Sequence, residues 1–305
     1  MLCLRHWRTS NNTKSAIAFI SRTTSISFFH AALQGCRSLT CLNKVIKFIQ
    51  TRIRNHERFL GRRLRMKIYT GTSGYGYKEW KGIFYPEKIS PKEMLHFYAE
   101  RLTAVEINNT FYHMPTADVL DSWAEQVPAH FLFAVKAPQV ITHFRRLRHV
   151  SEEARYLFGT LPVLGSKLGP VFFQFPESFH ADRPLLEAFI DLIPNDISPA
   201  FEFRHPSWFE NEILELLRDR GCCLCTADTD ESPAGEIIST ASWGYLRLRR
   251  SDYTDADMAA WIGKIISEKW QSAFVFFKHE DEAKGPHSAM RFQELVALRQ
   301  ESIKA

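Results

Sequence analysis

From Met66 onward, eight short apolar runs alternate with amphipathic stretches, and this alternation limits the folds that the chain can adopt. The runs have the length of strands buried on both faces, and the stretches between them have helical spacing. The expected strands are residues 67–71, 104–108, 131–136, 170–175, 199–204, 222–228, 244–249 and 273–278. The expected helices are residues 91–101, 117–126, 151–164, 183–193, 208–220, 255–269 and 288–301.

Eight strands that alternate with helices over about 240 residues are typical of an α/β fold of one class, a single (β/α)8 TIM-type barrel. We therefore predict one barrel domain over residues 66–305. An open, doubly wound sheet is the alternative, and it usually has a glycine-rich phosphate-binding turn after its first strand. The glycines between Gly71 and Gly76 do not have that spacing, and Trp80 and Pro86 follow where a helix would begin. The barrel is favoured.

Helix ends are marked at three places. Ser90 followed by Pro91 predicts a helix start, and Thr254 is expected to cap the helix after the seventh strand. Gly221 is expected to end the preceding helix, because glycine readily adopts the left-handed conformation of a helix C-terminus.

Residues 1–65 have a different composition from the rest of the chain. They hold 13 Lys and Arg against one acid, Glu57, whereas residues 66–305 hold 26 basic and 33 acidic residues, a net charge of −7. We expect residues 1–65 to be a disordered or foreign basic leader, with Met66 as the true start. A mitochondrial transit peptide and a basic surface helix are the alternatives. The whole-chain charge of +5 is then no argument for nucleic-acid binding.

The apolar runs and the cysteines indicate the cellular compartment in which the chain is expected. No run approaches the roughly 18 residues needed to span a bilayer, so we expect no membrane partner. Cys222, Cys223 and Cys225 crowd one expected strand without the spacing of a disulfide framework, which indicates a reducing compartment. We expect a cytoplasmic protein, or a mitochondrial one if the leader is a transit peptide.

Polar side chains stand late in most of the expected strands, after mainly apolar positions. Because side chains alternate along a strand, we expect these polar groups to point into the barrel at its carboxyl end, where barrel enzymes have their sites. The expected ring is Glu106, Asn108, Lys136, Gln174, Glu202, Arg204, Asp228, Arg247, Arg249 and Lys278. Five cations then face three carboxylates, an excess of two positive charges. Such a ring should prefer a carboxylate or phosphate. Buried charges that only neutralise one another are the alternative for any single member.

Several segments resemble the YecE-like family, also called domain of unknown function 72. They are YTGTSGY at 69–75 with Trp80, VEINNTFY at 105–112, FAVKAP at 133–138 with ITH at 141–143, LGPV at 168–171 leading to QFP at 174–176, FEFRHPSW at 201–208, and FKHE at 277–280 with KGP at 284–286. The resemblance covers residues 67–300 in order and implies a single (β/α)8 barrel. The family has no agreed reaction, so the resemblance implies no catalytic residue.

The first functional hypothesis is an enzyme, a hydrolase or lyase, that acts on an anionic and perhaps phosphorylated small molecule. Glu106 and Glu202 are the expected general acid and base, Lys136 an electrophile or a lysine of lowered pKa, and His143 a proton carrier. A glycosidase would use the two glutamates as paired carboxylates. The expected substrate-binding residues are Ser73, Tyr75, Asn108, Tyr112, Gln174, Arg204, His205, Trp208, Asp228, Arg247, Arg249 and Lys278.

Two alternatives remain open. Aromatic side chains in the expected loops, among them Trp80 and Trp208, favour a barrel that binds nucleic acid or cleaves phosphodiesters. A barrel that binds a ligand without catalysis is the other. No histidine pair has a tight metal-binding spacing such as HxxxH, and we predict no metal and no cofactor.

Overall fold

The computed structural model describes residues 66–278 and 281–304 of the 305-residue chain, which belong to one compact unit. The predictions for residues 1–65 lie outside the described residues. Two parallel sheets have the strand orders β1-β9-β8-β7 and β2-β3-β4-β5-β6. The strands are β1 Lys67–Thr72, β2 Ala104–Ile107, β3 Leu132–Lys136, β4 Leu168–Gln174, β5 Pro199–Glu202, β6 Cys223–Leu224, β7 Thr226–Asp228, β8 Trp243–Leu248 and β9 Ser272–Phe277.

The edges of the two sheets are connected at both sides, which gives a barrel-like wall. At one side, Ser73 after β1 forms an isolated bridge with Glu106 of β2, and the Gly74 amide donates to the Glu106 carbonyl at 2.8 Å. At the other side, β6 and β7 are separated by Cys225 alone, whose amide donates to the Phe201 carbonyl of β5 at 2.8 Å. The expected sixth strand is therefore present as two short pieces.

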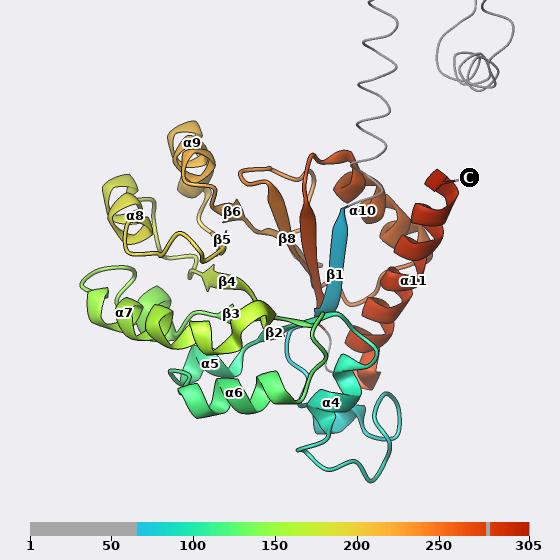
Figure 1. The fold of residues 1–305 in the computed structure, drawn as a ribbon. Coiled ribbons are helices and arrows are strands. Elements are labelled where there is room, and N and C mark those ends of the chain that lie inside the picture. The colour runs from blue at the N-terminus through green and yellow to red at the C-terminus, as the bar shows by residue number, and fades with distance from the viewer. Residues whose placement is uncertain (1–65, 279–280, 305) are drawn as a thin grey trace, which may run out of the picture. The chain divides into compact units, whose positions relative to one another are not determined.

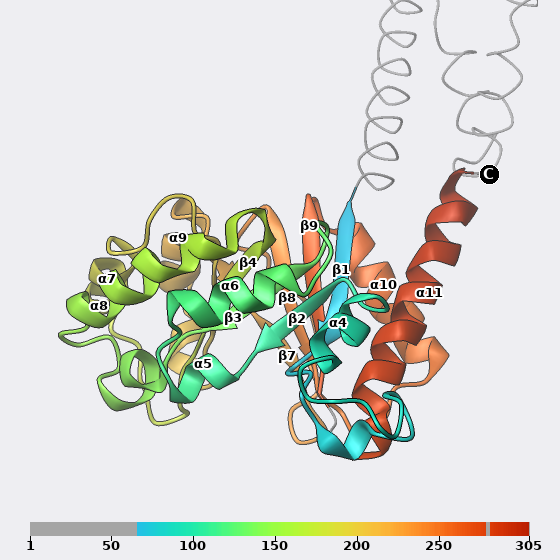
Figure 2. The same ribbon diagram turned by 60° about the horizontal axis from the view of Figure 1, so that its bottom comes forward.

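Helices lie around the outside of the strands (Figure 1), and α11 packs along β1 and β9 (Figure 2). The α-helices are α4 Met94–Ala99, α5 Asn109–Tyr112, α6 Ala117–Glu125, α7 Ser151–Thr160, α8 Arg183–Ile190, α9 Asn211–Asp219, α10 Asp255–Ser267 and α11 Lys284–Lys304. Short 3-10 or π turns are η2 Lys78–Trp80, η3 Val140–Phe144, η4 Leu161–Lys167, η5 Pro206–Phe209 and η6 Asp281–Ala283.

Two of the three predicted helix ends are confirmed. Thr254 and Asp257 form a capping box at the start of α10, and Gly221 has a φ of 64° just after α9. The predicted start at Pro91 is wrong, because α4 begins at Met94. The segment before α4 forms a turn instead, in which the Ser90 amide donates to the Glu93 carboxylate at 3.0 Å.

Alternation along the strands separates two apolar layers. Outward side chains such as Phe173 and Phe201 pack against the helices in a large aromatic core. Inward side chains form a smaller interior cluster in which the alanines of three strands lie beside large aromatic rings. Its buried members are Ala104, Ala134, Phe172, Ala200, Cys223, Cys225, Tyr245, Phe274 and Phe276. The mixture of small and large side chains fills the interior, as expected for a packed barrel rather than a pore.

Close approach of β1 and β2 depends on a glycine. A Cβ atom at Gly71 would lie 1.8 Å from the Ala104 carbonyl oxygen, a distance that no side chain tolerates. The glycine therefore brings the ends of these strands together, and Ser73 and Glu106 follow directly from them. Over the described part of the chain, the helices are too short or too polar to cross a bilayer.

Candidate functional site

Inward polar side chains from five strands meet at the carboxyl ends of the strands, above the aromatic interior. They are Glu106 of β2, Lys136 of β3, Gln174 of β4, Glu202 of β5 and Arg247 of β8. All five are buried. The expected gathering of these side chains is therefore present in the structure.

Arg247 is the centre of the cluster. Its Nε and Nη2 donate to the two oxygens of Glu106 at 2.9 and 3.0 Å, and its Nη1 donates to Glu202 Oε2 at 2.9 Å. The Tyr245 hydroxyl adds a hydrogen bond to Glu106 Oε2 at 2.8 Å. The Arg247 guanidinium lies 4.8 Å above the Phe172 ring, so the aromatic layer is the floor of the charged cluster.

Both glutamates are held in their charged form. Burial is the largest single influence and raises the pKa of both carboxyls. The nearby cations, Arg247 first, together with hydrogen bonds to the carboxylate oxygens, outweigh it and lower the pKa of Glu106 below its ordinary value and that of Glu202 to about 2. Glu106 is 0% exposed and bonded at both oxygens. These contacts favour a structural role for Glu106, because an enclosed carboxylate of low pKa is a poor proton donor.

Lys136 is joined to Glu202 through Gln174. The lysine Nζ donates to Gln174 Oε1 at 2.8 Å, and Gln174 Nε2 donates to Glu202 Oε1 at 2.6 Å. The same Nζ lies 4.3 Å above the Phe111 ring. Burial, followed by the nearby Arg247 charge, lowers the pKa of Lys136 to about 8. A sizeable share of this amine is therefore neutral near physiological pH.

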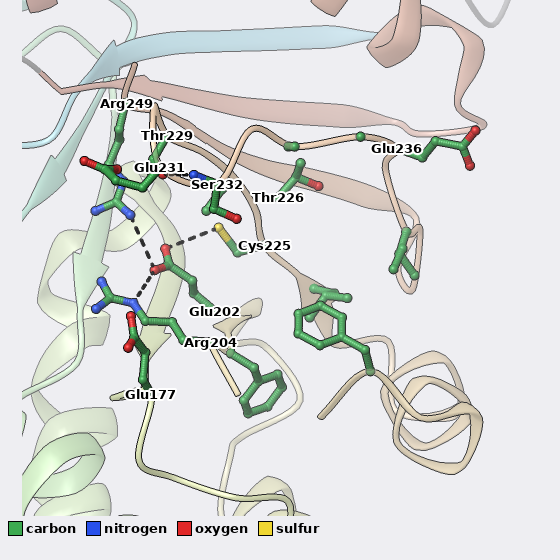
Figure 3. Close-up of a pocket in the computed structure, with 17 residues that line it drawn as sticks. Glu177, Glu202, Arg204, Cys225, Thr226, Thr229, Glu231, Ser232, Glu236 and Arg249 are labelled. Carbon is green, nitrogen blue, oxygen red and sulfur yellow. Dashed lines mark hydrogen bonds and ion pairs between the residues drawn. The ribbon is translucent and has the colours of Figure 1, made fainter. Parts of the chain in front are cut away.

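A cavity of about 560 Å³ opens beside Glu202. Arg204 and Arg249 line it and converge on the same carboxylate oxygen, with N–O distances of 3.4 and 3.9 Å (Figure 3). The two guanidinium groups are less buried than Arg247, with 36% and 18% of their side chains exposed. They are the cations that an entering molecule can reach.

The cavity also has an acidic side. Glu177 follows β4, and Glu231 and Glu236 lie in the loop after β7. All three are exposed lining residues. The lining of the cavity therefore holds both the two arginines that contact Glu202 and three exposed carboxylates (Figure 3).

Four further expected residues lie near the cluster. His143 is half-buried, bonded through Nδ1 to the Thr142 hydroxyl at 2.9 Å and packed edge-on against Phe111 at 4.9 Å. Burial and then the Lys136 charge lower its pKa. Asn108 donates to Glu106 at 3.3 Å, and Ser73 is buried. Tyr112 is 64% exposed and contacts Phe111 edge-on.

Two expected binding residues belong to the aromatic core instead. Trp208 is 0% exposed, stacks on Phe203 at 4.3 Å and donates through Nε1 to the Phe179 carbonyl. Tyr75 packs against the outer core, with its ring 6.3 Å from Tyr98. Both follow strand ends in the sequence, but their rings point away from the barrel interior because apolar burial outside the wall is available to them.

Asp228 was expected on the inner face and lies on the outer one. Cys223 and Cys225 are inward residues of this segment and Ala227, in register with Arg247, continues their face, so Asp228 points outward and accepts from Arg250 and Tyr253. Lys278 is exposed and lines a separate cavity of about 220 Å³. His205 hydrogen-bonds to Ser207, and its ring centroid lies 3.7 Å from that of His180 with the two rings tilted by 38°, outside the Arg247 cluster.

Sequence reasoning missed three contributors. Cys225 lines the cavity with its sulfur 3.8 Å from Glu202, Tyr245 bonds Glu106, and Phe111 lies between Lys136 and His143. The spacing of Tyr245, two residues before Arg247, could have placed it on the same face. Among the described residues, no group of three or more His, Cys, Asp or Glu side chains is arranged to hold a metal ion.

Fold and site together define a barrel-like α/β protein with a charged cluster at the carboxyl ends of its parallel strands. The chain belongs to the family described as protein of unknown function DUF72, whose model matches residues 69–305. This membership confirms the family resemblance of the sequence motifs.

Relatives agree with this assignment. UPF0759 protein YecE of Escherichia coli K12 is 28% identical over 155 residues, which are 50% of this chain and 54% of YecE. UPF0759 protein YunF of Bacillus subtilis is 29% identical over 183 residues, 56% of this chain and 64% of YunF. The matches therefore span less than two thirds of either relative.

Solved structures share the fold. A DUF72 family protein from Thermotoga maritima has 25% identity and a TM-score of 0.67, covering 76% of this chain and 99% of its own. A DUF72 family protein from Enterococcus faecalis, at 18% identity and a TM-score of 0.61, covers 76% and 98%.

Proposed function

We propose that the chain is a closed (β/α)8 barrel enzyme, a hydrolase or lyase, that acts on a small anionic molecule in the cavity beside Glu202. One observation carries the proposal. The cations Lys136, Arg204, Arg247 and Arg249 surround the carboxylates Glu106 and Glu202, an excess of two positive charges within this cluster, while Glu177, Glu231 and Glu236 line other parts of the cavity. Such an excess in a partly enclosed cavity attracts a carboxylate or phosphate.

The charged side chains of the cluster differ in solvent exposure, and we assign them different roles for that reason. Arg204 and Arg249 are accessible from the cavity and would bind the anionic group. Glu202 and Arg247 would fix the direction of these guanidinium groups, because buried ion pairs hold their partners in place. Lys136 would be the reacting group, as an electrophile or proton carrier, with His143 as its neighbour across Phe111.

The acidic side of the cavity favours a small anion over a polymer. A phosphate chain that entered the cavity would pass Glu177, Glu231 and Glu236, which repel it. A compact anion reaches the arginines without filling the outer part of the cavity. The net charge of −7 for residues 66–305 acts in the same direction.

Titration of the full chain with inorganic phosphate, glyoxylate and a 12-nucleotide single-stranded DNA tests the proposal by calorimetry. Phosphate or glyoxylate should bind with one site, and Arg204→Gln should weaken binding by about tenfold, which corresponds to about 1.4 kcal/mol. Arg155→Gln on α7, an exposed arginine far along the outer helix layer, is the matched control and should bind normally. Absence of anion binding, or equal loss in both variants, contradicts the proposal.

A nucleic-acid-binding barrel is the second candidate, and one observation favours it. Tyr112 of α5 and Phe144 of η3 are 64% and 71% exposed, and exposed aromatic rings beside cations can stack bases. Trp80 and Trp208, the other rings expected for this role, are buried. If DNA binds, falls off steeply with salt and is weakened by Tyr112→Ala, this candidate replaces the first. Anion binding without any turnover would favour a ligand-binding barrel.

A further inference from the structure

The amine of Lys136 has unusual neighbours for a buried lysine. It donates to one neutral amide oxygen, Gln174 Oε1, and faces the Phe111 ring. Within the described residues, the ion pairs of Glu106 and Glu202 shorter than 4.0 Å involve Arg204, Arg247 and Arg249 and not Lys136. The carboxylates of the cluster are therefore occupied by arginines.

A half-buried lysine elsewhere in the described residues has more hydrogen-bond partners than Lys136. Lys167 donates to two backbone carbonyls, those of Ala124 and Val127. An ammonium group has three donors, and Lys136 uses one of them toward a protein atom in the described part of the chain. Lys136 is thus held in place by one hydrogen bond and a ring, with most of its nitrogen surface not engaged by acceptors.

An anionic substrate would be oriented relative to this amine. Gln174 connects Lys136 to Glu202, and Arg204 and Arg249 contact the Glu202 carboxylate from the cavity side. Arg204 is close enough for its charge to lower the pKa of Lys136, so a small molecule whose anionic group binds Arg204 would have its remaining atoms near the amine. This arrangement suits a carbonyl carbon close to a carboxylate or phosphate in the same small molecule.

We propose that Lys136 is a nucleophile that forms a Schiff base with the carbonyl carbon of a small aldehyde or ketone carrying a carboxylate or phosphate. The inference rests on the proposed function and names its substrate class. Lysine Schiff bases require an amine that is neutral for part of the time and a carbonyl held beside it.

The neutral amine attacks the carbonyl carbon, a C–N bond forms, and the C=O electron pair moves to oxygen, which takes up a proton. Nitrogen gives a proton to solvent. The carbinolamine then loses its hydroxyl as water, and the nitrogen lone pair forms the C=N bond of the imine.

The lowered pKa of Lys136 supports its role as a nucleophile, because a larger share of the amine is neutral. With a pKa of about 8, against an ordinary 10.5, about a tenth of the Lys136 amine is neutral at pH 7. An exposed lysine is neutral at well under a thousandth at that pH. The difference is on the order of 10²-fold in reactive amine.

Borohydride trapping of the full chain tests the inference. The protein is incubated at pH 7 with glyoxylate, an aldehyde that carries a carboxylate, and reduced with sodium borohydride, which converts the imine to a stable secondary amine. Peptide mass spectrometry then locates the adduct. We expect labelling of Lys136 at least tenfold above that of Lys67, an exposed lysine at the opposite end of β1.

Two controls separate the reactivity of the amine from binding of the anionic group: acetaldehyde, which has no anionic group, and the variant Arg249→Gln. Arg249→Gln should lower glyoxylate labelling of Lys136 by about tenfold and leave acetaldehyde labelling unchanged. Lys136→Arg should abolish the adduct while circular dichroism shows a folded chain. Equal labelling of Lys136 and Lys67 by glyoxylate overturns the inference. If phosphate still binds in that case, the proposed function survives, and if neither anion binds, it is the proposed function that fails.

Discussion

The two ends of the barrel interior are built from the same strands and differ completely in chemistry. At the amino end, Tyr69 of β1 stacks on Phe274 of β9 at 4.9 Å, and Trp243 of β8 contacts Phe274 edge-on. At the carboxyl end, four residues further along β8, Arg247 binds two buried carboxylates. One end is thus filled with aromatic rings and the other with charges.

This difference teaches how stability and function are divided. Aromatic packing at the amino end is stabilising without any partner, whereas charges at the carboxyl end are stable only as a complete network. Within that network, the enclosed pairs around Arg247 contribute structure, and the cations that border the cavity are available to a ligand. Variants at the two ends therefore separate effects on stability from effects on binding.

Arg247→Gln should lower the free energy of unfolding by about 3–5 kcal/mol, because it leaves Glu106 and Glu202 buried without their main partner. Urea denaturation followed by circular dichroism measures the loss. Arg220→Gln is the control, since Arg220 pairs with Asp191 and Glu187 at the surface and its removal should change the midpoint little. Similar losses in the two variants would mean that the buried network has no special structural role.

Phe274→Ala should cost about 3 kcal/mol of stability, because it opens a cavity among the rings of the amino end. The same variant should bind phosphate with unchanged affinity at a temperature where it is folded. Calorimetry measures the affinity and urea denaturation the stability. A loss of phosphate affinity beyond twofold would show that the two ends are coupled.

Lys136 should give the stability a pH dependence in alkali. Its pKa is about 8 in the folded chain and 10.5 as an ordinary lysine, so the unfolded chain holds more protons between these values and stability rises with pH in that window. Relative to Lys136→Met, the wild-type chain should gain up to about 3 kcal/mol between pH 8 and 10.5. Urea midpoints over this pH range give the difference, and parallel curves for the two proteins would exclude the lowered pKa.

Arg249→Gln should have the smallest effect on stability and a clear effect on binding. The Arg249 side chain is partly exposed and 3.9 Å from Glu202, so its removal leaves the Arg247 pairs intact. Affinity for phosphate should fall about tenfold, or about 1.4 kcal/mol, in calorimetry. If the urea midpoint falls while the affinity stays constant, Arg249 belongs to the structural part of the network.

Much of the fold could be predicted because its signal is local. Seven of the expected strands lie within two residues of the observed ones at each end, and Thr254 and Gly221 cap helices where their chemistry indicates. The start of α4 at Met94 was missed because the Ser90 turn and a helix N-terminus have similar sequence signatures. The sixth strand was predicted as one strand, but it is divided at Cys225 into β6 and β7. Residues 222–228 contain no glycine or proline that would indicate this division.

The candidate site was predictable where alternation along the strand holds. Glu106, Lys136, Glu202 and Arg247 could be placed together, because each occupies an inward position of a regular strand. Asp228 was assigned to the wrong face, because the residue types of its strand do not show which set of alternate positions points inward. Trp208 could not be placed either, because a loop residue has no periodicity to show on which side of the wall it packs.

The sequence by itself determined the alternation of strands and helices, the family, and the set of charged residues at the strand ends. Tertiary structure alone decided which carboxylates are enclosed by Arg247 and which cations, Arg204 and Arg249, border the cavity. The physical reason is that alternation fixes a direction along one strand, while the pairing of charges depends on distances between strands far apart in the chain.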